Sequence, residues 1–347
     1  MQTNNLVLYR KYRPQNFSEV LGQDHIVDTI QKAISLGNIA HAYLFSGTRG
    51  TGKTSIARLL AQEIKTSSND LNEIDAASNR GIDDIRELRE AVTVMPFESD
   101  YKVYIIDEVH MLTKEAFNAL LKTLEEPPKH VIFVLATTEI EKIPDTILSR
   151  CQSFIFKKPS LEILKKSVLD ICKKEKLELE NGAEDLIALL GDGSFRDTLG
   201  ILQKVISASS DSKISTKEVE KITGAPKGEL VNDFIFAIAE KDLNKGLKAV
   251  QQATEDSIDA QLFLKLILHK LRAILLVRFA NDMVKVVQDD FSEKDFEFIE
   301  KLAKTKDSNL NSQTLIELIE SSDKIKLSYI SQLPLELVLI KLIKDVK

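Results

Sequence analysis

One octapeptide constrains the fold of this chain more than any other feature of its sequence. Residues 47–54 read Gly-Thr-Arg-Gly-Thr-Gly-Lys-Thr, which satisfies the pattern G-x-x-x-x-G-K-[ST]. The apolar run Ala42–Phe45 precedes it, and the helical stretch Ser55–Lys65 follows it. Glycines let such a loop turn its amides inward around phosphates, and the N-terminus of the next helix adds a partial positive charge. The sequence therefore predicts a strand, a phosphate-binding loop and a helix in that order.

The side chains of this loop predict both phosphate and metal contacts. We expect Lys53 to reach the β- and γ-phosphates of a nucleotide and the hydroxyl of Thr54 to ligate Mg²⁺. A glycine-rich turn without a ligand is the alternative, and the complete octapeptide in a strand–helix context disfavours it. The predicted nucleotide-binding set is Gly47, Thr48, Arg49, Gly50, Thr51, Gly52, Lys53, Thr54 and Ser55.

A second apolar run, Val103–Ile106, ends in the two carboxylates Asp107 and Glu108. In open α/β sheets, ligands bind at the carboxyl ends of the strands. We expect Asp107 to hold Mg²⁺ through water and Glu108 to orient or deprotonate the attacking water. A solvated loop is the alternative for such an acidic pair, and its occurrence together with the phosphate-binding loop favours the catalytic interpretation.

A third apolar run, Val131–Ala136, ends in the hydroxyls of Thr137 and Thr138. One of the two could hydrogen-bond the γ-phosphate or the attacking water, and the motif favours Thr138. Two arginines, Arg150 and Arg196, are candidates to neutralise the γ-phosphate, because a single lysine leaves its transition-state charge undercompensated. A surface salt bridge is the alternative for either arginine.

Length and composition limit the remaining possibilities. The chain has 347 residues, which corresponds to two or three domains of about 150 residues. Its 47 basic and 53 acidic residues give a net charge of −6, so any nucleic-acid contact needs a local basic surface. Two cysteines, Cys151 and Cys172, exclude a disulfide framework and a four-cysteine zinc site within one chain. The apolar stretch Phe263–Ala280 contains five basic residues or histidines, so we predict no membrane span. The apolar run Leu6–Tyr9 is too short for a signal-peptide core, and we expect a cytoplasmic location.

The order of strand-like and helix-like segments predicts three regions. Alternation of the two in the first region is typical of a parallel sheet flanked by helices. After Pro159 the pattern becomes helical, and residues 224–228 form a Gly- and Pro-containing break. We therefore predict an α/β nucleotide-binding domain over residues 1–158, a small helical domain over 159–224 and an all-α domain over 225–347.

These residues resemble a known family. Residues 9–17 and 20–23 (Tyr-Arg-Lys-Tyr-Arg-Pro-Gln-Asn-Phe and Val-Leu-Gly-Gln) resemble the N-terminal box of clamp-loader ATPases. The runs 41–55, 107–112 and 117–128 are similar to the gamma/tau family of bacterial DNA polymerase III, and Ser149-Arg150-Cys151 matches the arginine motif of clamp loaders. The similarity is dense from about residue 8 to 200 and weaker in the C-terminal helices.

The resemblance implies an AAA+ ATPase whose helical lid and C-terminal collar follow the α/β domain. It implies partners as well: further copies of the chain, delta and delta-prime subunits, a sliding clamp and primer–template DNA. By position, the hydrolytic site would contain Lys53, Thr54, Asp107 and Glu108. The resemblance places Thr138 at the sensor 1 position, Arg196 at the sensor 2 position in cis, and Arg150 at the ATP of a neighbouring subunit. Tyr12, Pro14, Val20 and Leu21 would lie near the adenine, with plain packing as the alternative.

The sequence departs from the family pattern in two ways. A four-cysteine zinc module usually separates the helix after the phosphate-binding loop from the next strand, and here Lys65 is followed by Thr66–Asp70 and Leu71–Ser78 instead. We therefore predict no zinc. The length is gamma-like, and we expect no tau extension.

A few exposed cations are candidates for contacts with the DNA backbone. Arg86 and Arg89 are three residues apart on one expected helix face, and Lys114 and Lys122 lie on the expected helix after the carboxylate strand. Repeated phosphate contacts over several subunits would give salt-dependent, sequence-independent binding. Solvated helix faces with local salt bridges are the alternative.

Three other functions are alternatives to a clamp-loader motor. A catalytically inactive delta-prime-like subunit conflicts with the intact Lys53 and the Asp107–Glu108 pair. A Holliday-junction motor would need a winged-helix domain after the lid, which the long helical C-terminal region disfavours. A scaffold that uses ATP only to set its shape would not turn over ATP, so the effect of Glu108→Gln distinguishes it.

Overall fold

The computed structural model describes residues 6–209, 212–305 and 308–344. These residues pack into two compact units. The first contains the chain up to Lys166 together with Gly191–Gly200, and the second contains Ser167–Leu190 together with the residues after Ile201. The three domains predicted from the sequence, over residues 1–158, 159–224 and 225–347, stay a prediction.

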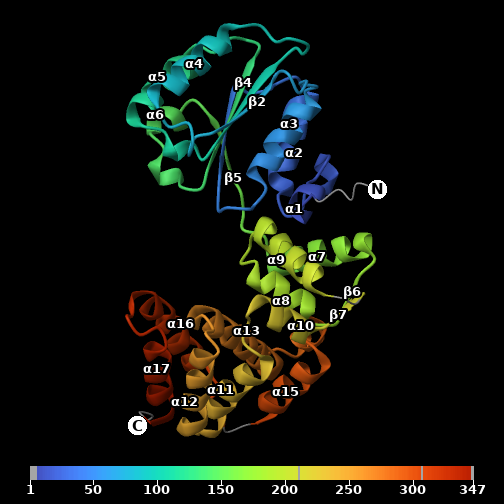
Figure 1. The fold of residues 1–347 in the computed structure, drawn as a ribbon, viewed down its shortest axis with the longest axis vertical. Coiled ribbons are helices and arrows are strands. Elements are labelled where there is room, and N and C mark those ends of the chain that lie inside the picture. The colour runs from blue at the N-terminus through green and yellow to red at the C-terminus, as the bar shows by residue number, and fades with distance from the viewer. Residues whose placement is uncertain (1–5, 210–211, 306–307, 345–347) are drawn as a thin grey trace. The chain divides into compact units, whose positions relative to one another are not determined.

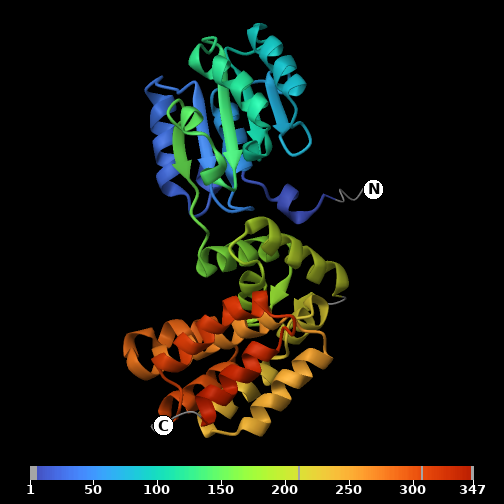
Figure 2. The same cartoon turned by 90° about the vertical axis from the view of Figure 1, so that its left-hand side faces the viewer.

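A parallel five-stranded sheet forms the centre of the first unit, in the order β2-β3-β4-β1-β5 (Figures 1 and 2). Its strands are β1 (Ala42–Ser46), β2 (Leu71–Asp75), β3 (Lys102–Asp107), β4 (Val131–Thr137) and β5 (Gln152–Ile155). The sequence predicted β1, β3 and β4 because these are continuous apolar runs. It missed β2 and β5, which are the edge strands and alternate only weakly between buried and exposed residues.

Helices cover both faces of the sheet, as the parallel fold predicted from the sequence requires (Figure 1). Successive strand residues point to opposite faces, so Tyr43 and Phe45 pack with α2 and α3 while Leu44 packs with α4, α5 and α6. The helices and short 3₁₀ turns of this part are α1 (Leu8–Lys11), η1 (Phe17–Glu19), α2 (Asp24–Ser35), α3 (Lys53–Glu63), α4 (Ile82–Thr93), η2 (Val109–Met111), α5 (Lys114–Glu125), η3 (Ile140–Lys142) and α6 (Asp145–Leu148).

The rest of the described chain is almost entirely helical, in agreement with the sequence pattern. Two short strands, β6 (Glu178–Leu179) and β7 (Lys213–Ile214), pair in parallel. The first helices are α7 (Leu161–Glu175), α8 (Ala183–Leu190), α9 (Phe195–Ala208) and α10 (Thr216–Thr223). The later ones are α11 (Gly228–Glu240), α12 (Leu243–Glu255), α13 (Ala260–Phe279), η4 (Asn281–Met283), α14 (Val284–Asp290), α15 (Glu293–Lys304), α16 (Ser312–Leu327) and α17 (Leu333–Lys344).

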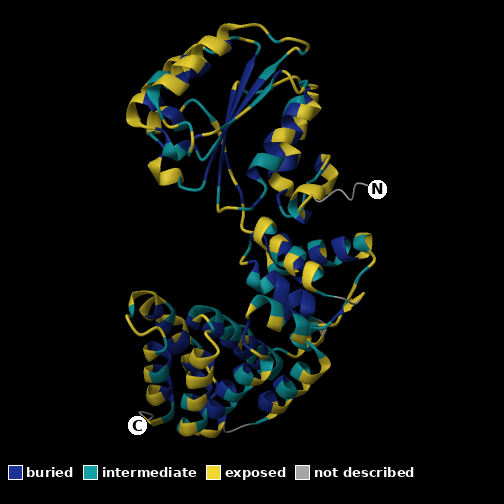
Figure 3. Cartoon of the chain, in the orientation of Figure 1, coloured by how far each residue is buried: buried dark blue, intermediate teal, exposed yellow. Residues whose placement is uncertain are grey.

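Helix α13 is the centre of the C-terminal bundle. It contacts α11, α12, α14, α15 and α16 and buries Phe263, Ile267, Leu271 and Ile274. Figure 3 shows buried residues on the inner faces of the bundle and exposed residues on its outer faces. The basic residues that interrupt the apolar pattern of α13 therefore belong to a packed helix of a bundle. Among the described residues, no helix is long and apolar enough to cross a membrane.

Candidate nucleotide-binding site

The phosphate-binding loop begins where β1 ends, at the carboxyl edge of the sheet. Gly47 and Gly50 have φ angles of 144° and 75°, in the region that favours glycine. A Cβ atom at Gly47 would lie 2.6 Å from the carbonyl oxygen of Phe156, and one at Gly50 would overlap the hydroxyl of Ser194. The amide of Phe195 also donates to the carbonyl of Gly50 at 3.0 Å. Residues 191–200 therefore pack directly on the loop.

Lys53 is the first residue of α3, and the whole residue is only 6% exposed. Its Nζ donates to the carbonyl oxygens of Gly47 at 2.7 Å and Thr48 at 2.9 Å. Burial lowers the pKa of Lys53, and Arg196 lowers it further, whereas the carboxylates of Glu108 and Asp107 oppose the shift. The cation is thus held inside the loop with both predicted carboxylates and Arg196 in electrostatic reach.

Two side chains with metal-ligating oxygen atoms, one from α3 and one from β3, meet beside Lys53. The hydroxyl of Thr54 donates to Oδ2 of Asp107 at 2.9 Å. Hydroxyl and carboxylate oxygens are the ligands that Mg²⁺ prefers, and a Mg²⁺ ion usually keeps several waters around a few such groups. The pair therefore fits the predicted metal site, and the residues that would hold the ion are Thr54 and Asp107.

Glu108 follows β3 in a left-handed conformation, with φ at 50° and ψ at 43°. This conformation costs a non-glycine residue about 1–2 kcal/mol. Oε2 of Glu108 accepts a hydrogen bond from the hydroxyl of Thr138 at 3.0 Å. The two side chains predicted to act on the attacking water are therefore in direct contact, from the ends of two adjacent strands.

His110, for which the sequence predicts no role, completes this group. Its side chain is 5% exposed; Nδ1 lies 3.0 Å from the hydroxyl of Thr137 and 3.5 Å from Oε2 of Glu108. Nε2 lies 3.2 Å from a carboxylate oxygen of Glu139. His110 forms no recognisable motif with the other four histidines, so the sequence gives no sign that it contacts Glu108. The structure thus separates the two threonines: Thr138 contacts Glu108, and Thr137 contacts His110.

Arg196 lies in the first turn of α9 and is exposed. Its guanidinium carbon lies 5.9 Å from the centre of the Tyr9 ring, and that of Arg10 lies 5.9 Å from the same ring. Arg13 is close as well, because burial lowers its pKa with further lowering by Arg58, Arg196 and Arg10 against the opposing charge of Glu73. The guanidinium groups of Arg10 and Arg196 therefore both lie near Tyr9, and Arg13 is within electrostatic reach of both.

The four residues predicted near the adenine are all partly exposed: Tyr12, Pro14, Val20 and Leu21. Val20 packs against the core under α2 and α3, so packing accounts for part of its burial. The neighbouring Gln23 is 1% exposed and binds Lys157 twice, through Nε2 to the carbonyl at 2.8 Å and through Oε1 from the amide at 3.1 Å. These two hydrogen bonds attach the N-terminal box to the segment after β5. The sequence around Gln23 gives no indication of this contact.

Arg150 binds elsewhere, at the ends of α5 and α6. Its Nη2 lies 2.6 Å from Oε1 of Glu125, and its Nη1 donates to the carbonyl of Thr146 at 2.7 Å and to the hydroxyl of Ser149 at 3.2 Å. Its side chain is 33% exposed. These partners all lie outside the phosphate-binding loop of the same chain.

The four DNA candidates are exposed side chains on α4 and α5: Arg86, Arg89, Lys114 and Lys122. Arg86 also forms an ion pair with Asp83 at 3.1 Å, as the salt-bridge alternative proposed. The amide of Thr113 donates to the carbonyl of Arg80 at 3.2 Å, so the N-termini of α4 and α5 lie next to each other.

The segment 64–70 joins α3 to β2 and contains no cysteine. Both cysteines are free thiols, and burial raises the pKa of each to about 11. Within the described ranges, no group of three or more His, Cys, Asp or Glu side chains is placed to hold a metal ion.

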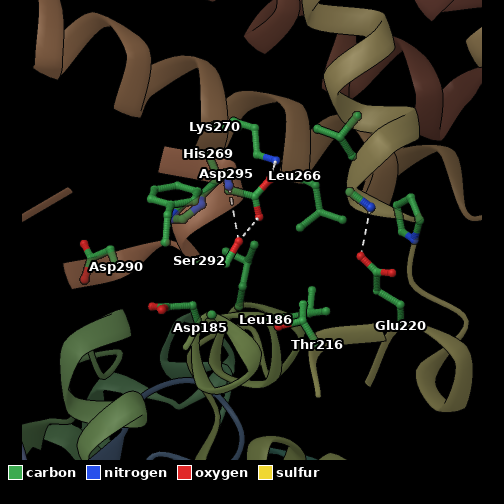
Figure 4. A pocket seen from close by; sticks show the side chains of 16 residues that line it. Asp185, Leu186, Thr216, Glu220, Leu266, His269, Lys270, Asp290, Ser292 and Asp295 are labelled. Carbon is green, nitrogen blue, oxygen red and sulfur yellow. Dashed lines mark hydrogen bonds and ion pairs between the residues drawn. The ribbon is translucent and has the colours of Figure 1, made fainter. Parts of the chain in front are cut away.

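A separate cavity of about 70 Å³ lies in the second unit (Figure 4). Inside it, Nζ of Lys270 donates to Asp295 at 2.6 Å and to Asn232 at 2.8 Å. Glu220 accepts from the amide of Gly228 at 2.8 Å, and burial raises the pKa of this carboxyl, assisted by the charge of Asp295. None of the residues that line the cavity belongs to the predicted nucleotide site.

Two family profiles match separate parts of the chain. The profile of the family described as DNA polymerase III, delta subunit, matches residues 64–160, and that of DNA polymerase III subunits gamma and tau domain III matches residues 214–347. The Holliday junction branch migration motor RuvB of Thermotoga maritima superimposes with a TM-score of 0.53 at 20% identity, over 65% of this chain and 78% of that one. This likeness shows a shared fold.

Curated relatives match most of the chain. The tau subunit of DNA polymerase III from Bacillus subtilis is 37% identical over 91% of this chain and 59% of its own length. The Escherichia coli tau subunit is 39% identical over 81% of this chain and 47% of its own length, so the chain spans about half the length of these two relatives. The gamma subunit from Buchnera aphidicola is 36% identical over 88% of both chains. Similarity of this extent shows that the chain belongs to the gamma/tau subunit family of bacterial DNA polymerase III.

Proposed function

We propose that this chain is an ATP-hydrolysing motor subunit of a clamp loader, which opens a ring-shaped sliding clamp and loads it onto primed DNA. The observation that carries the proposal is the meeting of two pairs, Thr54 with Asp107 and Thr138 with Glu108, at the sheet edge where Lys53 lies. Metal-binding oxygens, a general base and a phosphate-binding cation are the minimum that ATP hydrolysis requires.

The residues suggest how hydrolysis proceeds. Lys53 exchanges its bonds to the loop carbonyls for oxygens of the β- and γ-phosphates. Thr54 and Asp107 would hold Mg²⁺, which when bound would supply positive charge against the phosphates. Glu108, oriented by Thr138, accepts a proton from water; the water oxygen bonds to the γ-phosphorus, and the bond from this phosphorus to the bridging oxygen of ADP breaks. Arg196 in cis, and Arg150 from a neighbouring subunit, stabilise the developing charge.

An exposed apolar stripe on α16 and α17 supports the proposed assembly. Ile316, Ile319, Leu333, Leu337 and Ile340 are 37–56% exposed, and their spacings of three or four residues place them along the outer faces of these two helices. Exposed large apolar side chains that line up along a helix are typical of protein interfaces. The proposed partners there are further copies of the chain and cognate delta and delta-prime subunits. The exposed cations on α4 and α5 remain candidates for backbone contacts with primer–template DNA.

The test is ATP turnover by this chain assembled with its cognate delta and delta-prime subunits, with and without sliding clamp and primed DNA. We expect strong stimulation by clamp and primed DNA together, lost in Arg150→Ala and in Glu108→Gln, while Glu108→Gln still binds ATP. Unchanged turnover in Glu108→Gln would refute the hydrolytic assignment. ATP binding without any stimulation would favour the scaffold or a motor with a different DNA substrate.

A further inference from the structure

Two helix ends converge on the guanidinium of Arg150. Glu125 is the last residue of α5, and the carbonyl of Thr146 lies in the short helix α6 that precedes Arg150. Carbonyl groups at helix C-termini carry partial negative charge, so a cation is stabilised there. Glu125, Thr146 and Ser149 therefore hold a side chain that would otherwise sample many rotamers.

The arrangement leaves part of the guanidinium available to another ligand. A guanidinium has five N–H donors, and the three hydrogen bonds to Glu125, Thr146 and Ser149 use three of them. Arg150 is 33% exposed and Glu125 is 49% exposed on their side chains, so the group lies at the surface. A phosphate oxygen from outside the chain could thus bind Arg150 while Glu125 stays in place.

We propose that Glu125 is a positioning residue for Arg150: it orders the guanidinium in advance and presents it to the nucleotide of a neighbouring subunit. This inference rests on the proposed function, in which Arg150 acts in trans. Ordering a long arginine side chain costs conformational entropy. When that ordering is complete before the transition state, turnover increases without a matching change in ATP affinity.

The experiment uses the assembled complex with clamp and primed DNA, and four variants: Glu125→Ala, Glu125→Gln, Glu126→Ala and Arg150→Ala. Glu126 is the matched control, because it is the adjacent, exposed residue of the same type. We expect Glu125→Ala to lower kcat by about three- to tenfold with KM for ATP within about twofold, since two of the three contacts remain. Glu125→Gln keeps an acceptor oxygen and should retain most of the activity, and Glu126→Ala should match the unmodified chain.

A second measurement is independent of assembly. In the isolated chain, the side-chain NMR signal of Arg150, assigned by its loss in Arg150→Ala, should show hindered rotation that Glu125→Ala releases and Glu126→Ala leaves unchanged. Equal kcat for Glu125→Ala and Glu126→Ala, with Arg150→Ala inactive, would overturn the positioning role alone. A loss of kcat in both Glu125 variants that parallels a lower melting temperature would also overturn it, in favour of a structural role. Full stimulated activity in Arg150→Ala would instead refute the trans arginine of the proposed function.

Discussion

Replacing Gly50 by alanine tests how the phosphate-binding loop is coupled to the segment that carries Arg196. Gly50 has a φ of 75°, and its added Cβ would overlap the hydroxyl of Ser194 and lie 2.9 Å from the Cβ of that residue. Gly37 offers a matched control, since its φ is 70° and nothing lies within 4 Å of an added Cβ. The two substitutions therefore share a backbone cost and differ in the contact with Ser194.

The magnitudes follow from these two terms. A left-handed alanine costs about 1–2 kcal/mol, which is the whole effect expected for Gly37→Ala. Gly50→Ala adds overpacking of about 1–3 kcal/mol, because the hydroxyl of Ser194 must rotate and the two Cβ atoms still require a backbone shift. Rotation also weakens the hydrogen bond that Ser194 accepts from the amide of Asp197 at 3.2 Å, near the start of α9. We expect a total loss of about 2–5 kcal/mol.

Urea unfolding of Gly37→Ala, Gly50→Ala, Ser194→Gly and the Gly50→Ala/Ser194→Gly double variant measures these terms. The double variant should recover part of the loss, giving a coupling free energy of about 1–2 kcal/mol between the two positions. Gly50→Ala should also weaken binding of a fluorescent ATP analogue, whereas Gly37→Ala should not. Equal losses of stability for Gly37→Ala and Gly50→Ala, or additive effects in the double variant, would refute the reasoning.

Three further predictions concern the stability and assembly of the chain. Burial opposes ionisation of Asp70, but hydrogen bonds from the amides of Phe97 and Glu98 lead the contacts that hold its pKa well below the usual range. The contribution of Asp70 to the free energy of unfolding is therefore complete above about pH 4 and is lost as the pH falls below that. Asp70→Asn should lower the free energy of unfolding in urea by about 2 kcal/mol at pH 7 and by progressively less towards pH 3. Equal stability of the two proteins at pH 7 would contradict this. Lys270→Ala leaves Asp295 without its ion-pair partner and should lower the free energy of unfolding by about 2–3 kcal/mol in the same assay. The surface control Lys304→Ala should lower it by less than about 0.5 kcal/mol. Similar losses of stability in the two variants would show that burial of the ion pair is irrelevant. Leu337→Asp should change the melting temperature by no more than a few degrees, because the side chain is exposed. It should weaken self-association or subunit assembly by about tenfold or more in sedimentation experiments. Intact assembly would exclude the apolar stripe as the interface.

Local patterns were sufficient for the part of the fold that surrounds the phosphate-binding loop. The phosphate-binding loop, β1, β3, β4 and the flanking helices could be predicted because buried parallel strands are continuous apolar runs and the loop needs glycines at fixed positions. The same reasoning located the residues that the structure joins as Thr54–Asp107 and Glu108–Thr138. Their roles in hydrolysis remain predictions.

Tertiary structure alone decided the contacts that join distant residues. Phe154 is the one buried residue in the edge strands β2 and β5, so these strands lack a strong apolar pattern. His110 reaches Glu108 and Glu139 because η2 begins immediately after the left-handed Glu108, and Glu125 reaches Arg150 because α5 and α6 end at the same place. The pairings of His110 with Glu139 and of Arg150 with Glu125 depend on how strands and helices pack across 25 or more residues of sequence. Side chains that are individually common leave no spacing by which the sequence could reveal such pairs.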